Sequence, residues 1–235
     1  MTERTKTGIK GFDELIEGGF PRGSSVLLSG TPGTGKTIFA LQYLYNGCTK
    51  YDEKSMYVTF EEKKENLIDQ ALQFGLDFED LIKKKKIIVI EVSSSDISRH
   101  SVEEIITLAQ ENNVRRIVID SVSTLAVNAP NVFSRDSTPN EHTIMKFIYD
   151  FIDKLRSRTE ATCLVISHTD NEKSLSKDHI SEFLCDGIIH IMFESLGGEY
   201  SRSIIIKKMR RTKNNEDVHP VEITSKGIVI HSLDE

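Results

Sequence analysis

The sequence predicts an α/β fold, with a mainly parallel, twisted sheet flanked by helices and antiparallel strands at the C-terminus. Before about residue 170, short apolar runs alternate with longer helical patterns, which is typical of βαβ units. Beyond residue 187 the apolar runs are joined by short turns with no helix between them, as in an antiparallel sheet. A length of 235 residues suits one α/β domain, and we expect residues 1–235 to form it.

The first part of the chain contains candidate strands and helices in alternation. Short apolar runs predict strands at Val26–Ser29, Met56–Phe60, Ile87–Val92, Arg116–Asp120 and Cys163–Ser167. Helical patterns lie between them, at Thr37–Cys48, Lys64–Phe74, Ser101–Asn112 and His142–Arg158. The last pattern is the clearest, because its apolar residues from Ile144 to Leu155 keep three- and four-residue spacing on one face.

The C-terminal part of the chain predicts strands joined by short turns. Strand-like patterns cover Gly187–Glu194, Ser201–Met209 and Val221–Ile230. The turn signals are Leu196-Gly197-Gly198 and Ser225-Lys226-Gly227. Ala129–Asn140, which contains two prolines, is predicted to be a long mobile loop.

The composition indicates a folded protein in a reducing compartment. With 38% hydrophobic and 28% charged residues, the chain can bury a core and is unlike a disordered protein. A formal net charge of -6 argues against coating nucleic acid through bulk charge. The cysteines Cys48, Cys163 and Cys185 form no CxxC pair, and no apolar run approaches the length of a membrane span. We therefore expect a cytoplasmic protein without a membrane partner.

A phosphate-binding loop is predicted by Gly30-Thr31-Pro32-Gly33-Thr34-Gly35-Lys36-Thr37, which satisfies G-x-x-x-x-G-K-[ST] in full. An apolar strand precedes it and a helical run follows, as the motif requires. The glycines let backbone amides face an anion at the helix N-terminus. Lys36 is then expected to reach the β- and γ-phosphates of a nucleotide, and Thr37 to offer its hydroxyl to Mg²⁺. A chance glycine-rich turn is the weaker interpretation.

Two further strand ends carry acids that suit such a site. Asp120 ends an apolar strand, in the form of a Walker-B element that holds the Mg²⁺ shell. Glu61 and Glu62 follow another strand, where one of them can polarise an attacking water. The alternative for this pair is the first turn of a helix, where acids favour the helix dipole. Beside a phosphate-binding loop we prefer the catalytic interpretation.

Three other features have a structural and a functional interpretation. His168 ends the fifth strand, where it can sense a γ-phosphate, although a lone histidine at a strand end is more often structural. The run Lys83–Lys86 is most simply a solvated loop. Five of the seven residues Lys207–Lys213 are basic, which suits nucleic-acid phosphates, the phosphates of a nucleotide on another subunit, or a solvated arm. Alternation along this strand sends Lys208 and Arg210 to one side and Met209 to the other.

Taken together, these motifs resemble the KaiC-like branch of the RecA-superfamily ATPases, over nearly the whole chain. Besides the loop and the acids, the resemblance rests on Gly11–Leu15, Gly18–Gly23, Ile119–Val122 and Glu182–Gly187. It implies a RecA-like P-loop core that binds ATP and Mg²⁺, with Thr37 and Asp120 at the metal. It also implies nucleotide contacts from Gly30, Thr31, Pro32, Gly33, Thr34, Gly35, Lys36, Thr37 and Ile38.

The resemblance further implies a homo-oligomer, a hexameric ring in which ATP lies between neighbours. The family stretch K-x-R-G-T-x-H reaches the nucleotide of the adjacent subunit, and it matches Lys208, Met209, Arg210, Thr212 and Asn214 here. Two positions depart from the family pattern, because Arg211 replaces its glycine and Asn214 its histidine. An arginine at a positive φ is strained, and asparagine lacks the charge of a protonated histidine. Thr224-Ser225 match a position near the nucleotide in relatives.

Three hypotheses follow for the function. The first is an oligomeric, Mg²⁺-dependent ATPase, a slow regulatory or assembly motor in which Glu62 with Glu61 orients water and Lys208 and Arg210 act in trans. The second is a switch that binds ATP to fix its oligomeric state and a partner surface, with negligible turnover. The third is a recombinase-like, DNA-binding ATPase, which the negative net charge and the lack of a DNA-binding extension disfavour. The identity of any protein partner stays open.

Overall fold

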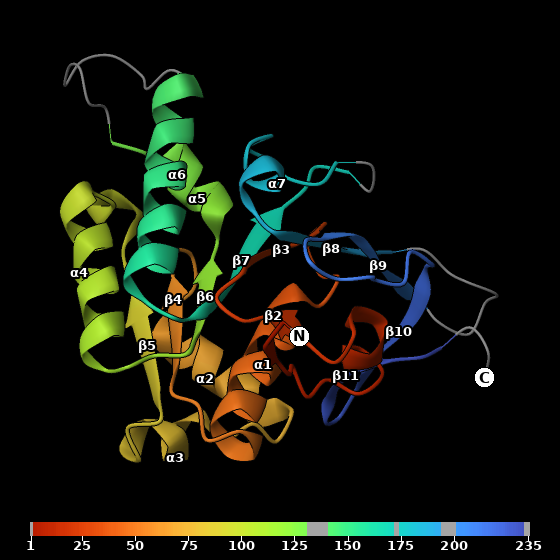
Figure 1. The fold of residues 1–235 in the computed structure, drawn as a ribbon. Coiled ribbons are helices and arrows are strands. Elements are labelled where there is room, and N and C mark those ends of the chain that lie inside the picture. Colours follow the sequence, from red (N-terminus) through yellow and green to blue (C-terminus); the bar gives the residue numbers. More distant parts are fainter. Residues whose placement is uncertain (1, 131–140, 172–173, 194–200, 233–235) are drawn as a thin grey trace.

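The fold is built around one large sheet, and the computed structural model describes residues 2–130, 141–171, 174–193 and 201–232. Among these residues, nine strands form the sheet in the order β11-β10-β9-β8-β3-β7-β6-β4-β5 (Figure 1). The order places β3 between β8 and β7, which both come much later in the sequence. Helical crossovers connect them, as the alternating pattern predicts.

Six strands form the parallel part of the sheet, and their bounds are β3 (Ser25–Gly30), β4 (Ser55–Thr59), β5 (Ile87–Glu91), β6 (Arg116–Asp120), β7 (Thr162–His168) and β8 (Gly187–Met192). Their register aligns the ends of the strands: Thr59 lies opposite Asp120, and Gly30 lies opposite His168. The carboxyl ends of these strands therefore share one side of the sheet, here called the carboxyl edge. The side where they begin is called the amino edge.

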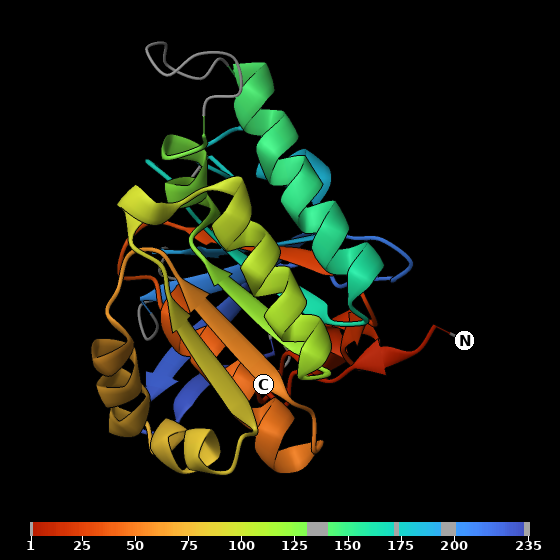
Figure 2. The same cartoon turned by 90° about the vertical axis from the view of Figure 1, so that its left-hand side faces the viewer.

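Helices cover both faces of the parallel strands, which explains why the strands read as continuous apolar runs. The helices are α1 (Lys36–Lys50), α2 (Lys64–Gln73), α3 (Phe78–Lys83), α4 (Arg99–Glu111), α5 (Val122–Val127), α6 (Glu141–Arg158) and α7 (Ser181–Leu184), with 3-10 turns at η1 (Asp13–Ile16) and η2 (Ser94–Asp96). One buried core lies between the sheet and α1, α2 and α3, and another between the sheet and α4, α5 and α6. Figures 1 and 2 show these two layers on opposite sides of the strands.

The antiparallel strands extend the sheet beyond β8, as predicted. They are β9 (Arg202–Met209), β10 (His219–Thr224) and β11 (Gly227–Ile230), each antiparallel to its neighbour. Met209 pairs with Gly187, so β9 ends at the amino edge. Two short strands, β1 (Arg4–Thr5) and β2 (Phe20–Pro21), form a separate pair.

The structure confirms the predicted fold class and adds elements that the pattern did not predict. These are β1, β2, α3, α5 and α7, all of eight residues or fewer. Lys83 belongs to α3 and not to a loop, because Asp77 caps this helix and ion pairs join Lys83 to Glu79 and Lys84 to Asp80. The predicted turn at Leu196–Gly198 and residues 131–140 of the predicted mobile loop lie outside the described residues.

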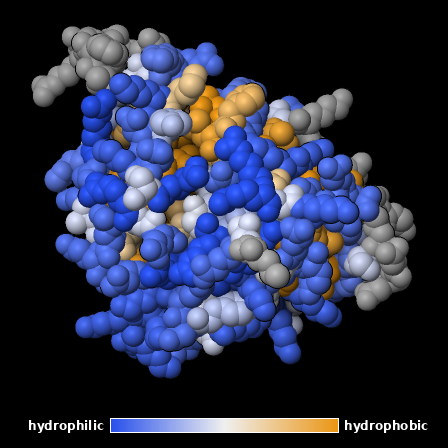
Figure 3. All heavy atoms as spheres, in the orientation of Figure 1, coloured by the Kyte–Doolittle hydropathy of each residue, from blue (hydrophilic) through white to orange (hydrophobic). Residues whose placement is uncertain are grey.

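The surface in Figure 3 is mainly hydrophilic, and hydrophobic residues gather near the top of that view, over the region of α6 and α7. Exposed large hydrophobic side chains on α5, α6 and α7 are Val127, Met145, Tyr149 and Phe183. Within the described part of the chain, no helix combines the length and the apolar character that crossing a bilayer requires.

Candidate active site

The predicted phosphate-binding loop connects the carboxyl end of β3 to the first turn of α1. Two of its glycines are required by the backbone. Gly30 has a φ of 153°, and a Cβ there would lie 2.3 Å from the carbonyl oxygen of Ile191. Gly35 has a φ of 106° and lies against Ile223 of β10. Larger residues at these two positions would force the loop away from the sheet.

Lys36 lies inside the concavity of this loop. It is 4% exposed, and its ammonium donates hydrogen bonds of 2.8 Å to the carbonyls of Gly30 and Thr31. The hydroxyl of Thr34 donates to the carbonyl of Thr31 over 2.9 Å, which stiffens the same turn. Thr37 follows in the first turn of α1 and is half-buried. Of the other predicted contact residues, Pro32 is exposed, whereas Ile38 packs partly against the core.

Asp120 lies at the carboxyl edge, at the end of β6. It is 6% exposed, and the phenol of Tyr57 donates a 2.5 Å hydrogen bond to its carboxylate. Burial raises the pKa of Asp120 to about 6, against the opposing effect of the Tyr57 hydrogen bond. A buried carboxylate of this kind gains from a cation beside it.

Glu61 is held by side chains from two neighbouring strand ends. One carboxylate oxygen accepts from the hydroxyls of Ser121 and Thr124 at the start of α5, and the other lies 3.1 Å from Nε2 of His168. The hydrogen bond with His168 lowers the pKa of Glu61 to about 2, and the bonds from Ser121 and Thr124 act in the same direction although partial burial opposes them. Both oxygens of this carboxylate are therefore engaged.

Glu62 has different surroundings. Its backbone is fixed by Thr59, whose hydroxyl accepts from the Glu62 amide and donates to the Glu62 carbonyl, each over 2.9 Å. Among the described residues, no group bonds its carboxylate. Partial burial, and then the negative charge of Glu61, raise the pKa of Glu62. The surroundings of the two neighbouring acids therefore lower the pKa of Glu61 and raise the pKa of Glu62.

From the sequence, His168 is predicted to lie near the γ-phosphate, although a structural role is favoured. It lies between the phosphate-binding loop and Glu61, because it pairs in register with Gly30 and its ring contacts Glu61. Its backbone N–H donates to the hydroxyl of Ser123. Because β7 pairs with β3, a histidine at the end of β7 indicates a residue beside the phosphate-binding loop, but this requires knowledge of the strand order.

Lys208 and Arg210 lie at the amino edge, far from the loop of the same chain. The ammonium of Lys208 donates over 2.8 Å to the carbonyl of Cys185, and Arg210 lies 3.4 Å from the carboxylate of Asp186. Burial and the neighbouring charge of Arg210 lower the pKa of Lys208. The six residues of β3 separate this edge from the loop, which is about 20 Å at the usual rise per residue. One chain therefore does not bring these cations to its own loop.

The residues that follow are anchored in the loop after β9. Thr212 accepts a 2.6 Å hydrogen bond from Arg4, and the side-chain amide of Asn214 donates to the carbonyl of Ile206 over 3.0 Å. Met209 is buried against Gly187. Arg211 has a φ of 60°, so the backbone here does adopt the left-handed conformation that suits a glycine.

Thr224 and Ser225 lie at the carboxyl edge, in the turn between β10 and β11. Thr224 donates its hydroxyl hydrogen to the carbonyl of Gly227 over 2.9 Å. Ile223, the residue before it, contacts Gly35 of the phosphate-binding loop. This turn is therefore on the same side as the loop of its own chain, in contrast to Lys208 and Arg210.

The donors near the loop suit Mg²⁺. Mg²⁺ prefers oxygen ligands and is usually bound by one or two protein groups, with phosphates and water completing its shell. The hydroxyl of Thr37 and the carboxylate of Asp120 are groups of this kind. The described residues contain no cluster of three or more His, Cys, Asp or Glu that could hold a metal ion by themselves. A metal that depends on nucleotide phosphates fits this donor set.

Comparisons with known proteins agree on one family. The family model described as the KaiC ATPase matches residues 5–235. A UPF0273 protein of Pyrococcus horikoshii is 32% identical, over 98% of this chain and 95% of its own length. The circadian clock oscillator protein KaiC of Synechococcus elongatus is 30% identical, over 98% of this chain and 44% of its own length. The crystal structure of a KaiC-like protein of Pyrococcus horikoshii matches with a TM-score of 0.86 and 33% identity, over 99% of this chain and all of that one.

Proposed function

The chain belongs to the KaiC family of ATPases, and from this premise we propose that it is a cytoplasmic, Mg²⁺-dependent ATPase whose active sites lie between the subunits of a homo-oligomer. The observation that carries the proposal is the meeting of the phosphate-binding loop, Asp120 and the Glu61–Glu62 pair at the carboxyl edge, while Lys208 and Arg210 lie at the amino edge. We infer a slow regulatory or assembly activity for this ATPase.

The loop and its neighbours would bind the nucleotide. Backbone N–H groups of the loop from Gly33 to Thr37 would surround the phosphates, and Lys36 would exchange its carbonyl partners for phosphate oxygens. Thr37 and Asp120 would hold Mg²⁺, which supplies charge neutralisation at the β- and γ-phosphates. The turn at Thr224-Ser225 would close the same side of the site.

The surroundings of the two glutamates favour different roles for them. A general base needs a free lone pair and a proton affinity suited to accepting a proton. Glu62 has both, because no described group bonds its carboxylate and its pKa is raised. Glu61 is less suited, because three side chains bond its two oxygens and its pKa is lowered to about 2. We assign Glu62 to orienting water and accepting its proton, and Glu61 to positioning this segment through His168 and α5.

The cations at the amino edge would complete the site of a neighbouring copy. Lys208 and Arg210 sit side by side on the Cys185–Asp186 turn, held there by hydrogen bonds that aim them away from the chain's own loop. A neighbour docked with its carboxyl edge against this amino edge would receive both charges near its γ-phosphate. Cations at such a position stabilise the charge that develops during phosphoryl transfer.

An ATP-dependent switch without turnover is the second candidate function. It is favoured by Arg211, which adopts the left-handed backbone that a glycine would adopt without strain, and by Asn214, whose amide is bonded to Ile206. Both changes can weaken the contact between subunits. The DNA-binding hypothesis is disfavoured by the formal net charge of -6.

One experiment separates these candidates: oligomer size and phosphate release followed on the same sample, with and without ATP and Mg²⁺. The ATPase predicts phosphate release that requires both Mg²⁺ and the assembled form, and this release should disappear in Lys36→Ala. Assembly on ATP without phosphate release would establish the switch. Phosphate release by a stable monomer would overturn the placement of the site between subunits.

A further inference from the structure

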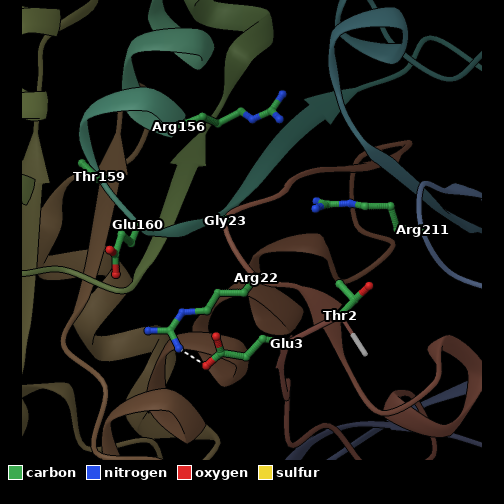
Figure 4. Close-up of a pocket in the computed structure, with 8 residues that line it drawn as sticks. All are labelled: Thr2, Glu3, Arg22, Gly23, Arg156, Thr159, Glu160 and Arg211. Carbon is green, nitrogen blue, oxygen red and sulfur yellow. Dashed lines mark hydrogen bonds and ion pairs between the residues drawn. The ribbon is translucent and has the colours of Figure 1, made fainter.

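We propose that a second site, at the amino edge, binds a phosphate-bearing anion between the guanidinium groups of Arg156 and Arg211. A cavity of about 680 Å³ opens there, beneath the end of α6 and beside the start of β3 (Figure 4). This volume is within the range of small-molecule sites, about 300–1,000 Å³, and the depression is widely open to solvent. Because the cavity lies at the opposite edge from the phosphate-binding loop, its ligand would not be the nucleotide held by the same chain.

Arg211 brings a side chain to a backbone position that favours glycine. Its φ of 60° is the left-handed conformation, yet the position carries a long cation. The backbone is held independently of that side chain, since the Arg211 carbonyl accepts from Arg4 and Arg4 also bonds Thr212. Within the described part of the chain, the guanidinium has no hydrogen-bond or ion-pair partner, and Figure 4 shows it extending into the cavity. A strained, unpaired arginine at a cavity wall is well placed to bind a ligand.

Arg156 reaches the same space from the last turn of α6. Figure 4 shows the side chains of Arg156 and Arg211 reaching into the same space from opposite sides. Its ion pair with Asp186 is long, at 3.5 Å, and the same carboxylate also faces Arg210 at 3.4 Å. Asp186 further accepts from the backbone N–H of Ser25. One carboxylate thus serves two guanidiniums, and Arg156 retains donors for a ligand.

The charges around the cavity do not balance. Arg22 is paired with Glu3, and Glu160 is paired with Arg115. Asp186 faces two further guanidiniums, those of Arg156 and Arg210, and not that of Arg211. Including these partners, five arginines face three carboxylates, which leaves two positive charges uncompensated in a chain of net charge -6.

Two facing guanidiniums with an excess of two positive charges select a particular kind of ligand. The planar fork of arginine matches phosphate and carboxylate oxygens in pairs. A phosphate group carries close to two negative charges at neutral pH, so it balances both uncompensated positive charges. A single carboxylate would balance only one of them. The ligand can be a free phosphate compound or the phosphates of a nucleotide on a neighbouring copy. The site itself does not depend on ATP hydrolysis.

The test uses the full-length protein with inorganic pyrophosphate as the probe. Titration calorimetry is done on Lys36→Ala, which removes the lysine of the phosphate-binding loop, in EDTA to exclude metal-bridged binding. We expect saturable binding that weakens about tenfold when Arg211→Gly or Arg156→Gln is added, as for the loss of a charge-assisted hydrogen bond. Lys213→Gln is the matched control, an exposed cation two residues from Arg211 outside the cavity wall, and should bind like its parent.

The outcomes distinguish the two sources of the anion. Pyrophosphate binding to Lys36→Ala that is sensitive to Arg211 and Arg156 identifies a free phosphate compound. If Lys36→Ala does not bind pyrophosphate, but Arg211→Gly weakens ATP-dependent assembly of the otherwise wild-type chain, the anion is the nucleotide of a neighbour. If pyrophosphate binding does not depend on Arg211 and Arg156, and Arg211→Gly assembles like wild type, the proposed anion site is wrong. Failure of the proposed ATPase is seen separately, as absent phosphate release by the wild-type chain. Arg211→Gly should not unfold the chain, because glycine relieves the backbone strain at this position. A loss of binding in this variant would therefore not result from misfolding.

Discussion

At the scale of single residues, the chemistry of the site depends on what surrounds two adjacent glutamates. Glu61 and Glu62 are neighbours in the sequence, yet one is engaged by Ser121, Thr124 and His168 and the other has a free carboxylate among the described residues. Two acids with separated pKa values are how proteins divide acid and base roles. The pattern predicts the pair but not the division, because the division comes from residues on other strands.

We expect Glu62→Gln to slow ATP hydrolysis by about 100-fold or more, the usual effect of losing a positioned base. ATP binding should persist, since the glutamine keeps the size of the side chain. Glu61→Gln should reduce the rate much less, about tenfold, by loosening the segment through its lost charge-assisted bond to His168. Phosphate release and nucleotide affinity of the two variants, measured side by side, check the assignment. A larger loss in Glu61→Gln than in Glu62→Gln would reverse the two roles.

Asp120 should destabilise the nucleotide-free fold at neutral pH. Its pKa is about 6 in the folded chain against an ordinary value of 3.8, so between these values the folded chain keeps a proton that the unfolded chain has lost. Stability therefore falls as the pH rises through this window, and the full penalty is present above it. We expect Asp120→Asn to raise the free energy of unfolding at pH 7 by about 1–3 kcal/mol, and by little at pH 4.

Urea unfolding in EDTA at the two pH values measures this effect. Asp69→Asn, at an exposed acid on α2, is the control and should change stability little at either pH. The same Asp120→Asn should lose Mg²⁺-dependent phosphate release, because an amide is a poor ligand for this cation. A pH-independent difference between wild type and Asp120→Asn would show that the buried charge is not the cause.

Arg211 should carry backbone strain that glycine relieves. A non-glycine residue in the left-handed region costs about 1–2 kcal/mol, and glycine costs about 0.5–1 kcal/mol in conformational entropy. We therefore expect Arg211→Gly to stabilise the chain by roughly 0.5–1 kcal/mol, the difference between these two effects. Chemical denaturation of this variant beside Lys213→Gly, which has no positive φ to relieve, measures it. Equal effects of the two substitutions would argue against strain at Arg211.

At the scale of elements, the sequence predicts best what is long or continuous. The buried strands β3 and β6 and the amphipathic α6 are found within two residues of their expected bounds. A strand buried on both faces gives a continuous apolar run, and a helix buried on one side gives apolar residues at helical spacing. Short elements have too few residues to show either pattern. The six residues of α5 are helical because Ser121 caps them against the sheet, and β1 exists only by pairing with β2. Likewise, the contact of His168 with Glu61 requires the strand order.

The end of β9 is the element whose role is most open to test. We expect Arg210→Ala to slow hydrolysis by about 10³-fold or more, as for cations that stabilise the transferring phosphoryl group. Lys207→Ala is the matched control: this exposed lysine is on the same strand, at the register shift between β8 and β9, where it pairs with no residue of β8. Steady-state phosphate release at saturating ATP measures both. Wild-type turnover by Arg210→Ala would remove the arginine from the reaction.

At the scale of the whole molecule, the sheet separates the two halves of the proposed site. The phosphate-binding loop is at the carboxyl edge and Lys208 and Arg210 are at the amino edge, on opposite ends of parallel strands. A head-to-tail contact between copies would bring the amino edge of one onto the carboxyl edge of the next, and the expected ring repeats this contact around its circumference.

Mixing two inactive variants should therefore restore activity. Lys36→Ala keeps its amino-edge cations and Arg210→Ala keeps its loop, so an interface between the two contains one complete site. We expect up to roughly a quarter of the wild-type rate from an equal mixture, since random pairing places about one complete site in four interfaces. Each variant alone, at the same total concentration, is the control. A mixture no faster than its components would contradict a site shared between copies.

Under the proposed arrangement, the separation of the two edges would also make the abundance of the protein a determinant of its activity. A subunit that holds only half of each site would have no useful output in isolation, so the rate per chain should rise with the total concentration of chains until assembly is complete. A cell could then set the response by changing expression modestly around the assembly threshold. Dilution alone would silence the protein without any inhibitor, and a truncated or mutated copy with one intact edge would block its neighbours.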